Sequence, residues 1–410
     1  MKKRILILGI IFLFFISVMN PMVIGYDVLT SDKELIVEDY NLNVYPVSEI
    51  FNMGKHIGFC KGNATPPDQP SDGPGSSNYS HGGIQESKYK WGAKQYWIFE
   101  PILPKPESAP LVVFNHGWGA TDPIAYIEWI NHIVKKGNIV VYPRYQRGLY
   151  LGFKEFNANA IQAVNDAIET LQQGDHVLPE LDKFAILGHS LGGGITANMA
   201  AQAEDEGLPT PKAIMPVQPF IAYSETANFS KIPAETLMIV IVGEDDTVVG
   251  NRSGIIIFNG SAQIPLSQKD FIIQVTDTYG DPDLVADHSA PVCFPRDSSD
   301  TVDAMDFYST WKLFDALTDY AFYGINEEYC LGNTSEQRFM GLWSDGTPVN
   351  ELKVTDNPIG ESVSVPVYNN KNSQPRSRIV TNLFYMRLFD SFPNLFPLLQ
   401  KLLQQLGFGL

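Results

Sequence analysis

The chain has 410 residues, of which 44% are hydrophobic, and it carries a formal net charge of −17. This length and apolar content fit one large domain with extensions, or two smaller domains, and they exclude a disordered, collagen-like or multi-span membrane protein. The excess of acidic side chains would repel phosphate backbones, so we expect no nucleic-acid partner.

The N-terminal residues 1–25 have the form of a secretory signal. Three basic residues, Lys2, Lys3 and Arg4, precede an unbroken apolar run over 5–19, and a short apolar stretch after positive charge is typical of export signals. The apolar stretch over 5–24 also approaches the roughly 20 residues that a membrane span needs, so an uncleaved anchor is the alternative. We therefore expect a secreted or cell-surface protein, with cleavage of the signal left open.

Residues 26–84 are interpreted as an N-terminal extension that ends in an exposed loop. The stretch over 61–83 is rich in Pro, Gly, Ser and Asn, the residues that favour turns. Two N-x-S/T sites, at Asn63 and Asn78, fall inside it and are compatible with glycosylation of an exported chain.

Over 85–325 short apolar runs alternate with stretches that have helical spacing. This alternation is typical of βαβ units, in which a parallel sheet is covered on both faces by helices, so the predicted fold class is α/β. The stretch over 303–323 adds a helix whose aromatic side chains are expected to pack in the core. The expected strands are the apolar runs at 111–114, 138–142, 184–187, 213–217, 237–242 and 271–275.

Residues 326–410 are interpreted as a C-terminal extension. Its last part, 392–410, places leucines on one stripe of a predicted amphipathic helix. Such a helix would dock on the protein itself, or lie on a membrane surface or a partner.

The three cysteines, Cys60, Cys293 and Cys330, form no C-x-x-C pair, so the sequence predicts no metal site, and we expect no cofactor. An exported protein can hold a disulfide. Our hypothesis is a Cys293–Cys330 bond, which would leave Cys60 free.

A candidate nucleophile lies where the apolar run 184–187 ends. The sequence Gly188-His189-Ser190-Leu191-Gly192 is a G-x-S-x-G motif between a predicted strand and a predicted helix. A sharp turn there lifts the serine hydroxyl above the end of the sheet, and side chains at 188 and 192 would collide with that turn. The helix that follows adds positive potential at its N-terminus.

A serine hydroxyl needs a base, and the base needs an orienting acid. Where a serine stands on such a turn, the acid and then the histidine follow it in the chain. Of the seven histidines, His288 follows an acidic residue at a downstream strand end. Asp246 is the first choice of acid and Asp245 the second, with solvated loop carboxylates as the alternative for both. The nearby Asp281, Asp283 and Asp287 are expected to cap turns, and a calcium site there is the alternative.

The oxyanion of the tetrahedral intermediate needs two backbone N–H donors. One candidate is Leu191, next to the nucleophile, and the other is Trp118, in the loop after the strand over 111–114. The Trp118 ring would wall the substrate pocket, or else simply pack in the core. We expect His116 and His189 to support these turns rather than to do chemistry.

Taken together, these residues resemble the α/β-hydrolase superfamily. More narrowly, the segments HGWG, GHSLGGG, GEDDTVV and DHSAP look like secreted carboxylesterases of the cutinase and bacterial polyester-hydrolase type, and like chlorophyllase and platelet-activating-factor acetylhydrolase relatives. The resemblance covers about 85–325 and implies a mostly parallel central sheet. It also implies Ser190 as nucleophile, Asp246 as acid, His288 as base, and Trp118 and Leu191 as the oxyanion pair. Polyester hydrolases usually have methionine at the position of Leu191 and an aromatic-Thr pair at that of Trp118-Gly119.

The predicted function is hydrolysis of carboxylic esters, small or polymeric, through an acyl-enzyme. A serine peptidase is the first alternative, but the segment before the first core strand is too short for the propeller domain that such peptidases often carry. A non-catalytic surface binding protein is the second alternative. Only residues 218–235 separate two core runs, which leaves no room for a large cap domain and predicts an open cleft that needs no interfacial activation.

Overall fold

The structure is a computed structural model that describes residues 64–147, 153–222, 226–294 and 302–358. The predicted signal or anchor over 1–25, residues 26–63 of the predicted extension and the amphipathic helix over 392–410 lie outside these residues. Among the helices of the described residues, none is both long and apolar enough to cross a membrane.

In the described part of the chain, nine strands form one sheet in the order β1-β2-β4-β3-β5-β6-β7-β8-β9. The six strands from β4 to β8 in this order are parallel, while β1, β2 and β9 join the edges antiparallel to their neighbours. The strands are β1 Gly83–Tyr89, β2 Tyr96–Ile102, β3 Ser108–Asn115, β4 Ile139–Pro143, β5 Leu178–His189, β6 Ala213–Val217, β7 Leu237–Gly243, β8 Lys269–Gln274 and β9 Lys353–Thr355.

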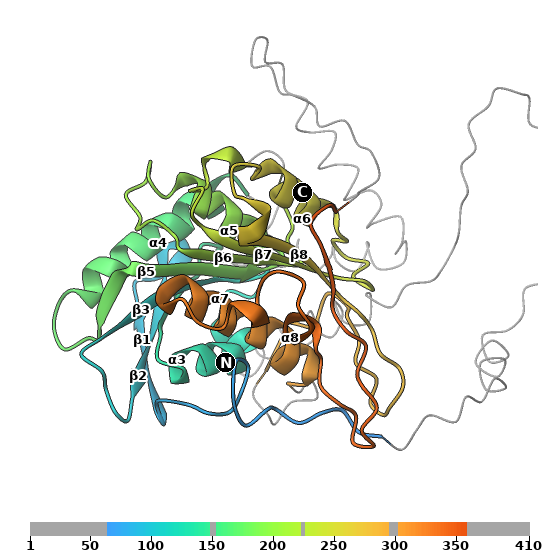
Figure 1. The fold of residues 1–410 in the computed structure, drawn as a ribbon. Coiled ribbons are helices and arrows are strands. Elements are labelled where there is room, and N and C mark those ends of the chain that lie inside the picture. Colours follow the sequence, from blue (N-terminus) through green and yellow to red (C-terminus); the bar gives the residue numbers. More distant parts are fainter. Residues whose placement is uncertain (1–63, 148–152, 223–225, 295–301, 359–410) are drawn as a thin grey trace, which may run out of the picture. The chain divides into compact units, whose positions relative to one another are not determined.

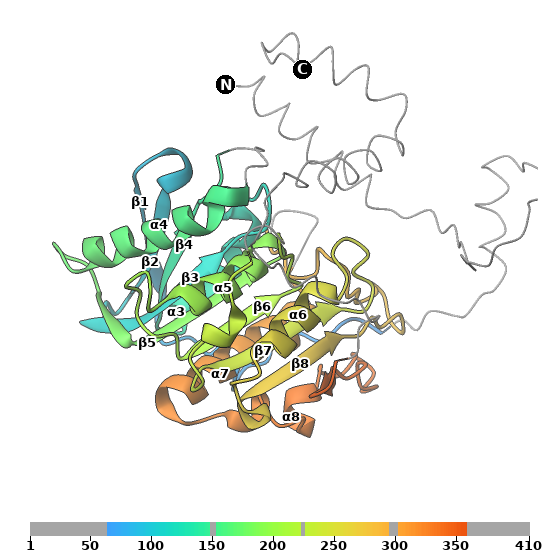
Figure 2. The same cartoon turned by 90° about the horizontal axis from the view of Figure 1, so that it is seen from above.

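Helices cover both faces of the sheet (Figure 1; Figure 2). One face carries α4 (Phe156–Leu171), α5 (Leu191–Gln202) and α6 (Arg252–Gly260). The other carries α3 (Ile127–Lys135) and α7 (Lys312–Tyr323). The π-helical turn η7 (Asp306–Trp311) leads directly into α7, and α8 is a single turn over Ser335–Arg338. The short 3-10 turns are η1 Gly92–Lys94, η2 Pro123–Tyr126, η3 Phe153–Glu155, η5 Phe229–Lys231, η6 Leu266–Gln268 and η8 Glu327–Tyr329.

The two-sided covering explains why the central strands contain continuous apolar runs rather than alternating apolar and polar residues. In β5, Phe184 and Ile186 pack in the cluster under α4, α5 and α6, while Ala185 and Leu187 pack in the cluster under α3 and α7. Successive side chains of a strand point to opposite faces, so both sets must be hydrophobic. Burial of each large apolar side chain contributes about 1.5–3 kcal/mol.

The predicted α/β fold class is confirmed, and the structure has a strand at each of the six predicted runs. The aromatic residues expected in the core, Phe307, Trp311 and Phe314, are buried. The elements that were not predicted include the edge strands β1, β2 and β9, helix α6 and the single turn α8. The sheet therefore continues past residue 325, because β9 pairs with β8.

The predicted Cys293–Cys330 disulfide is wrong, since both thiols are free. The backbone N–H of Trp129 donates to Cys293 Sγ at 3.3 Å, beside α3, whereas Cys330 Sγ donates to the Glu327 carbonyl at 3.4 Å, at the end of η8. Both side chains are fully buried, and burial raises both thiol pKa values. Each cysteine therefore behaves as a small hydrophobic side chain in its own part of the core.

We expect a Cys60→Ser variant to show no reaction with Ellman's reagent when folded and to release about two reactive thiols per chain in denaturant, because both thiols are buried and a thiol reacts as the exposed thiolate. Its melting temperature should be the same with and without dithiothreitol. A melting temperature lowered by the reductant, with no thiol released on unfolding, would show that a disulfide is present after all.

Candidate active site

Ser190 stands in the turn between β5 and α5. Its backbone has φ 57° and ψ −123°, a conformation that is strained for a residue with a side chain. Neighbouring backbone atoms leave no space around this turn. A Cβ at Gly188 would lie 2.5 Å from the carbonyl oxygen of Gly192, and a Cβ at Gly192 would lie 2.0 Å from that of Asn115. Both glycines are thus required by close backbone approach, as predicted.

His288 lies in the loop after β8 and reaches Ser190. Its Nε2 is 2.9 Å from Ser190 Oγ, and its Nδ1 is 2.8 Å from Asp246 Oδ2. Since a carboxylate only accepts, Nδ1 carries the proton and Nε2 is left to accept from the serine hydroxyl. The geometry thus brings together the hydroxyl, imidazole and carboxylate that the sequence singled out.

Asp246 is held as a carboxylate at the end of β7. Its side chain is fully buried, and its Oδ1 accepts hydrogen bonds from the backbone N–H groups of Val248 at 2.9 Å and Val249 at 3.0 Å. Burial by itself would raise the pKa of Asp246, but His288 and the two N–H groups outweigh it and keep the pKa below its ordinary value. The charge that orients His288 is therefore retained at neutral pH.

The other candidate carboxylates have different partners. Asp245 is exposed, and its Oδ2 accepts from Thr276 Oγ1 at 2.5 Å. Asp287 caps its own turn, accepting from the backbone N–H and the hydroxyl of Ser289. Of the two candidates for the acid, the geometry selects Asp246 over Asp245. In the part of the chain that the structure describes, no group of three or more His, Cys, Asp or Glu side chains is arranged to hold a metal ion.

The two oxyanion candidates come from segments that meet at Ser190. Leu191 is the first residue of α5, where backbone N–H groups have no intrahelical acceptor and the helix dipole is positive. Trp118 follows Gly117, and a Cβ added to Gly117 would lie 3.4 Å from Ser190 Cβ. Gly119 N–H donates to Gln146 Oε1 at 2.9 Å and so fixes this loop. The oxyanion role of both residues stays a prediction.

Two histidines flank the site, as expected from their turns. The ring nitrogens of His116 lie 2.7 Å from the carbonyl oxygens of Gly117 and Arg144, and burial lowers its pKa to about 4. His189 packs on His288, with ring centroids 4.7 Å apart. Burial, and then the charge of His288, lower the pKa of His189 to about 3. The ring of His189, whose partners are a hydroxyl and an amide oxygen, is therefore neutral at pH 7.

Sequence reasoning missed Tyr126 and Gln218. Tyr126 Oη lies 2.9 Å from His189 Nδ1, and Gln218 Oε1 lies 3.1 Å from His189 Nε2. Both side chains are buried. The one local signal at Gln218 is its position directly after β6, and its positive φ of 42° is visible only in the structure.

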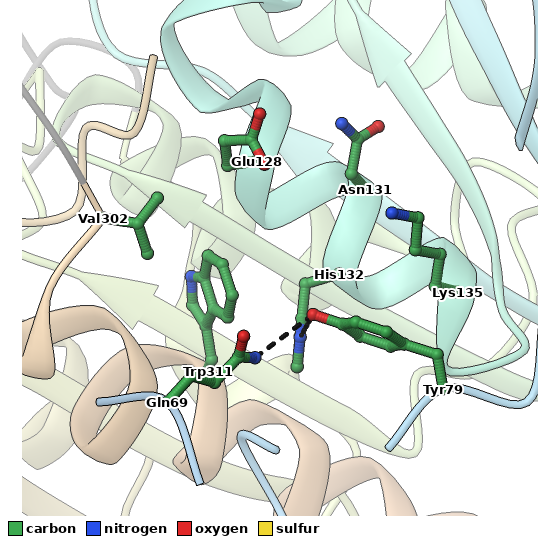
Figure 3. Close-up of a pocket in the computed structure, with 8 residues that line it drawn as sticks. All are labelled: Gln69, Tyr79, Glu128, Asn131, His132, Lys135, Val302 and Trp311. Atoms are coloured by element: carbon green, nitrogen blue, oxygen red, sulfur yellow. Dashed lines mark hydrogen bonds between the residues drawn. The ribbon is translucent and has the colours of Figure 1, made fainter. Parts of the chain in front are cut away.

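A cavity of about 330 Å³ lies apart from these residues, between the N-terminal segment, α3 and η7. Figure 3 shows Glu128, Asn131 and Lys135 following one another along α3, with Trp311 facing them from η7. His132 is fixed on this side by Asp315 Oδ2 at 2.9 Å and Tyr79 Oη at 3.1 Å. Through this second His–Asp pair, His132 on α3 is hydrogen-bonded to Asp315 on α7 and to Tyr79 in the segment before β1, so we assign the pair a structural role.

We expect Gly192→Ala to destabilise the protein by about 1–3 kcal/mol, because the added carbon meets backbone rather than a movable side chain. The roughly 1 kcal/mol by which alanine exceeds glycine in helix propensity favours the variant but does not offset this clash. Urea unfolding measures the change. Gly82→Ala is the control, since its Cβ would have a nearest neighbour at 3.6 Å; equal stability of the two variants would contradict the close-approach argument.

Residues 78–232 match the family model described as chlorophyllase. The match covers less than half of the chain and includes the Trp118 loop and the Ser190 turn, but it ends before Asp246 and His288. No curated protein matches the chain in sequence at a significant level. The match and the mostly parallel sheet are consistent with an α/β-hydrolase fold and suggest a hydrolase that acts on esters.

Proposed function

We propose that this protein is a secreted serine hydrolase that cleaves carboxylic esters through an acyl-enzyme. The observation that carries the proposal is the continuous chain from Ser190 Oγ to His288 Nε2, 2.9 Å, and from His288 Nδ1 to Asp246 Oδ2, 2.8 Å. A hydroxyl within hydrogen-bond reach of an imidazole that a carboxylate orients is the arrangement that activates a serine nucleophile.

In the first half-reaction, Ser190 Oγ attacks the ester carbonyl carbon while His288 Nε2 takes the hydroxyl proton. The oxyanion that forms is stabilised by the N–H groups of Leu191 and Trp118. The intermediate collapses, the bond to the alcohol oxygen breaks, and His288 gives its proton to the leaving alcohol. In the second half-reaction, His288 takes a proton from water, the resulting hydroxide attacks the acyl-enzyme, and the acid is released as Ser190 regains its proton.

The segment 218–235 supports an open cleft. Within its described residues, the regular structure is the single 3-10 turn η5, far less than a cap domain. Phe220, whose N–H donates to the Ser190 carbonyl at 2.8 Å, leaves 37% of its surface exposed, and Val248, two residues after Asp246, leaves 43%. These exposed apolar side chains belong to segments whose backbones bond to Ser190 and Asp246, and they suit the acyl or alcohol part of an ester. We infer activity on dissolved esters without interfacial activation.

Export is the second part of the proposal, and it is supported by the charge and apolar pattern of residues 1–25. Expression with and without this segment, followed by cell fractionation, tests it. A full-length protein that stays in the cytosol with its N-terminus intact would contradict the proposal.

We expect a fluorophosphonate probe to label the wild-type protein and not the Ser190→Ala variant. Asp246→Asn should lower kcat for a p-nitrophenyl ester by roughly 10³- to 10⁴-fold, because the imidazole loses the carboxylate that fixes its tautomer. The matched control is Asp245→Asn, which should keep wild-type activity, since Asp245 bonds to Thr276. A large loss in Asp245→Asn with none in Asp246→Asn would overturn the assignment of the acid.

The same experiment separates the alternatives. A serine peptidase would be labelled by the probe and would cleave a peptide amide in addition to the more reactive ester. A binding protein would not be labelled, and Ser190→Ala would leave its properties unchanged. Labelling with ester cleavage and no cleavage of the peptide amide supports the proposed function.

A further inference from the structure

A chain of hydrogen bonds through buried side chains joins one loop of the candidate site to another. It begins at Gly117, whose N–H donates to Tyr126 Oη at 3.0 Å, and Tyr126 Oη lies 2.9 Å from His189 Nδ1. His189 Nε2 lies 3.1 Å from Gln218 Oε1, and Gln218 Nε2 donates to the carbonyl of Asp287 at 2.6 Å. Gly117 precedes Trp118, and Asp287 precedes His288.

The donor in each of these bonds is fixed by its neighbours. The Asp287 carbonyl only accepts, so the Gln218 amide must direct its NH₂ there and its oxygen towards His189. His189 Nε2 therefore carries a proton, its Nδ1 accepts, and Tyr126 must donate its hydroxyl proton to it. All four bonds then point in one direction, from the loop of Trp118 to the loop of His288, an arrangement in which the bonds strengthen one another.

The chain is rigid because its members are buried. Tyr126, His189 and Gln218 are at most 3% exposed. A Cβ at Gly117 would lie 2.8 Å from Tyr126 Oη, and a Cβ at Gly243 would lie 2.8 Å from Gln218 Nε2. Backbone therefore packs directly against both ends, and neither the tyrosine nor the glutamine has room to turn away.

We propose that Tyr126, His189 and Gln218 are positioning residues that set the Trp118 loop and the His288 loop relative to Ser190. The inference rests on the proposed function, because the loops so placed are those of the proposed oxyanion donor and base. His189 acts as a neutral connector in this chain: its proton stays on Nε2 throughout the reaction, and His288 alone exchanges protons with Ser190.

Gln218→Met tests the proposal, since it keeps the length of the side chain and removes both hydrogen bonds. We expect kcat and the rate constant of fluorophosphonate labelling to fall by about 10- to 100-fold, because sub-ångström misplacement of reacting groups has effects of this size. KM should stay within about threefold of the wild-type value, as for groups that act on the transition state alone. Gln337→Met is the matched control: Gln337 is equally buried and its amide donates to the Cys330 carbonyl, far along the chain at α8.

Gln218→Glu tests the proposal through the pH dependence of its activity, which would not change if Gln218 only stabilised the fold. A protonated glutamic acid reproduces the glutamine, accepting from His189 and donating to Asp287, whereas a carboxylate has no proton to donate. Burial raises the pKa of a carboxyl group, so the activity of Gln218→Glu relative to wild type should recover as pH is lowered towards mildly acidic values. The relative activity of Gln218→Met should stay flat with pH.

Two results would overturn the inference: a wild-type labelling rate in folded Gln218→Met, or a flat relative pH profile in Gln218→Glu. Circular dichroism and thermal unfolding show whether each variant folds. If Gln218→Met does not fold, Tyr126→Phe removes one link from the other end of the chain and should show the same loss of kcat at unchanged KM; wild-type kcat would contradict the proposal.

A measurement that needs no activity separates this inference from the proposed function. In protein with ¹⁵N-labelled histidine, NMR should show His189 as the Nε2–H tautomer, without titration between pH 5 and 8, and Tyr126→Phe should perturb its Nδ1 signal. An Nδ1–H tautomer would overturn the chain whether or not the protein is active. Absence of labelling at Ser190 in the wild type would instead overturn the proposed function.

Discussion

Three backbone segments meet at Ser190 with no room for an additional carbon atom between them. A Cβ on Gly192 would overlap the carbonyl of Asn115 at the end of β3, and a Cβ on Gly188 would overlap the carbonyl of Gly192 in the first turn of α5. Ser190 itself has a left-handed backbone, a conformation that raises the energy by about 1–3 kcal/mol and persists only where the surroundings over-determine it. Here Ser190 N–H donates to the Val217 carbonyl at 2.9 Å. The ends of β3, β5 and β6 therefore fix where the hydroxyl lies.

The order of strands brings the other two groups to that point. From the centre of the sheet the order is β5, β6, β7, β8, so the loops after β7 and β8 lie at the same edge as the turn after β5. Backbone hydrogen bonds join these loops: Glu244 N–H donates to the Gln274 carbonyl and Asp245 N–H to that of Ala286. Asp246 and His288 thus approach each other because their backbones are already paired.

The features that the sequence could predict are those that a local pattern encodes. The central strands are buried on both faces, so each is an apolar run, and all six were found. Strand β2 was missed because buried Glu100, bonded to His176 at 2.8 Å, interrupts its pattern. Helix α6 was missed because consecutive isoleucines such as Ile255 and Ile256 favour strands.

The same distinction holds within the site. Ser190 could be identified from the sequence because its turn requires glycines on both sides. His288 could be identified by elimination among the seven histidines. Tyr126 and Gln218 have no distinguishing pattern in the sequence. Their role can be inferred only from the tertiary structure, which places them on either side of the His189 ring. The cysteines show the converse, because oxidising surroundings permit a disulfide but only the fold decides whether two thiols meet.

A second imidazole beside that of His288 poses an electrostatic problem that this fold solves by hydrogen bonding. In the proposed reaction His288 becomes an imidazolium in each acyl transfer, and a like charge on His189, 4.7 Å away between centroids, would oppose it. Burial first, and the charge of His288 second, hold the pKa of His189 near 3. The hydroxyl of Tyr126 and the amide oxygen of Gln218 satisfy both ring nitrogens of the neutral form. His189 can therefore lie next to Ser190 in the sequence and still connect two loops. Its Nδ1 already accepts the Tyr126 hydroxyl proton, and its Nε2–H is already donated to Gln218, so the ring stays neutral.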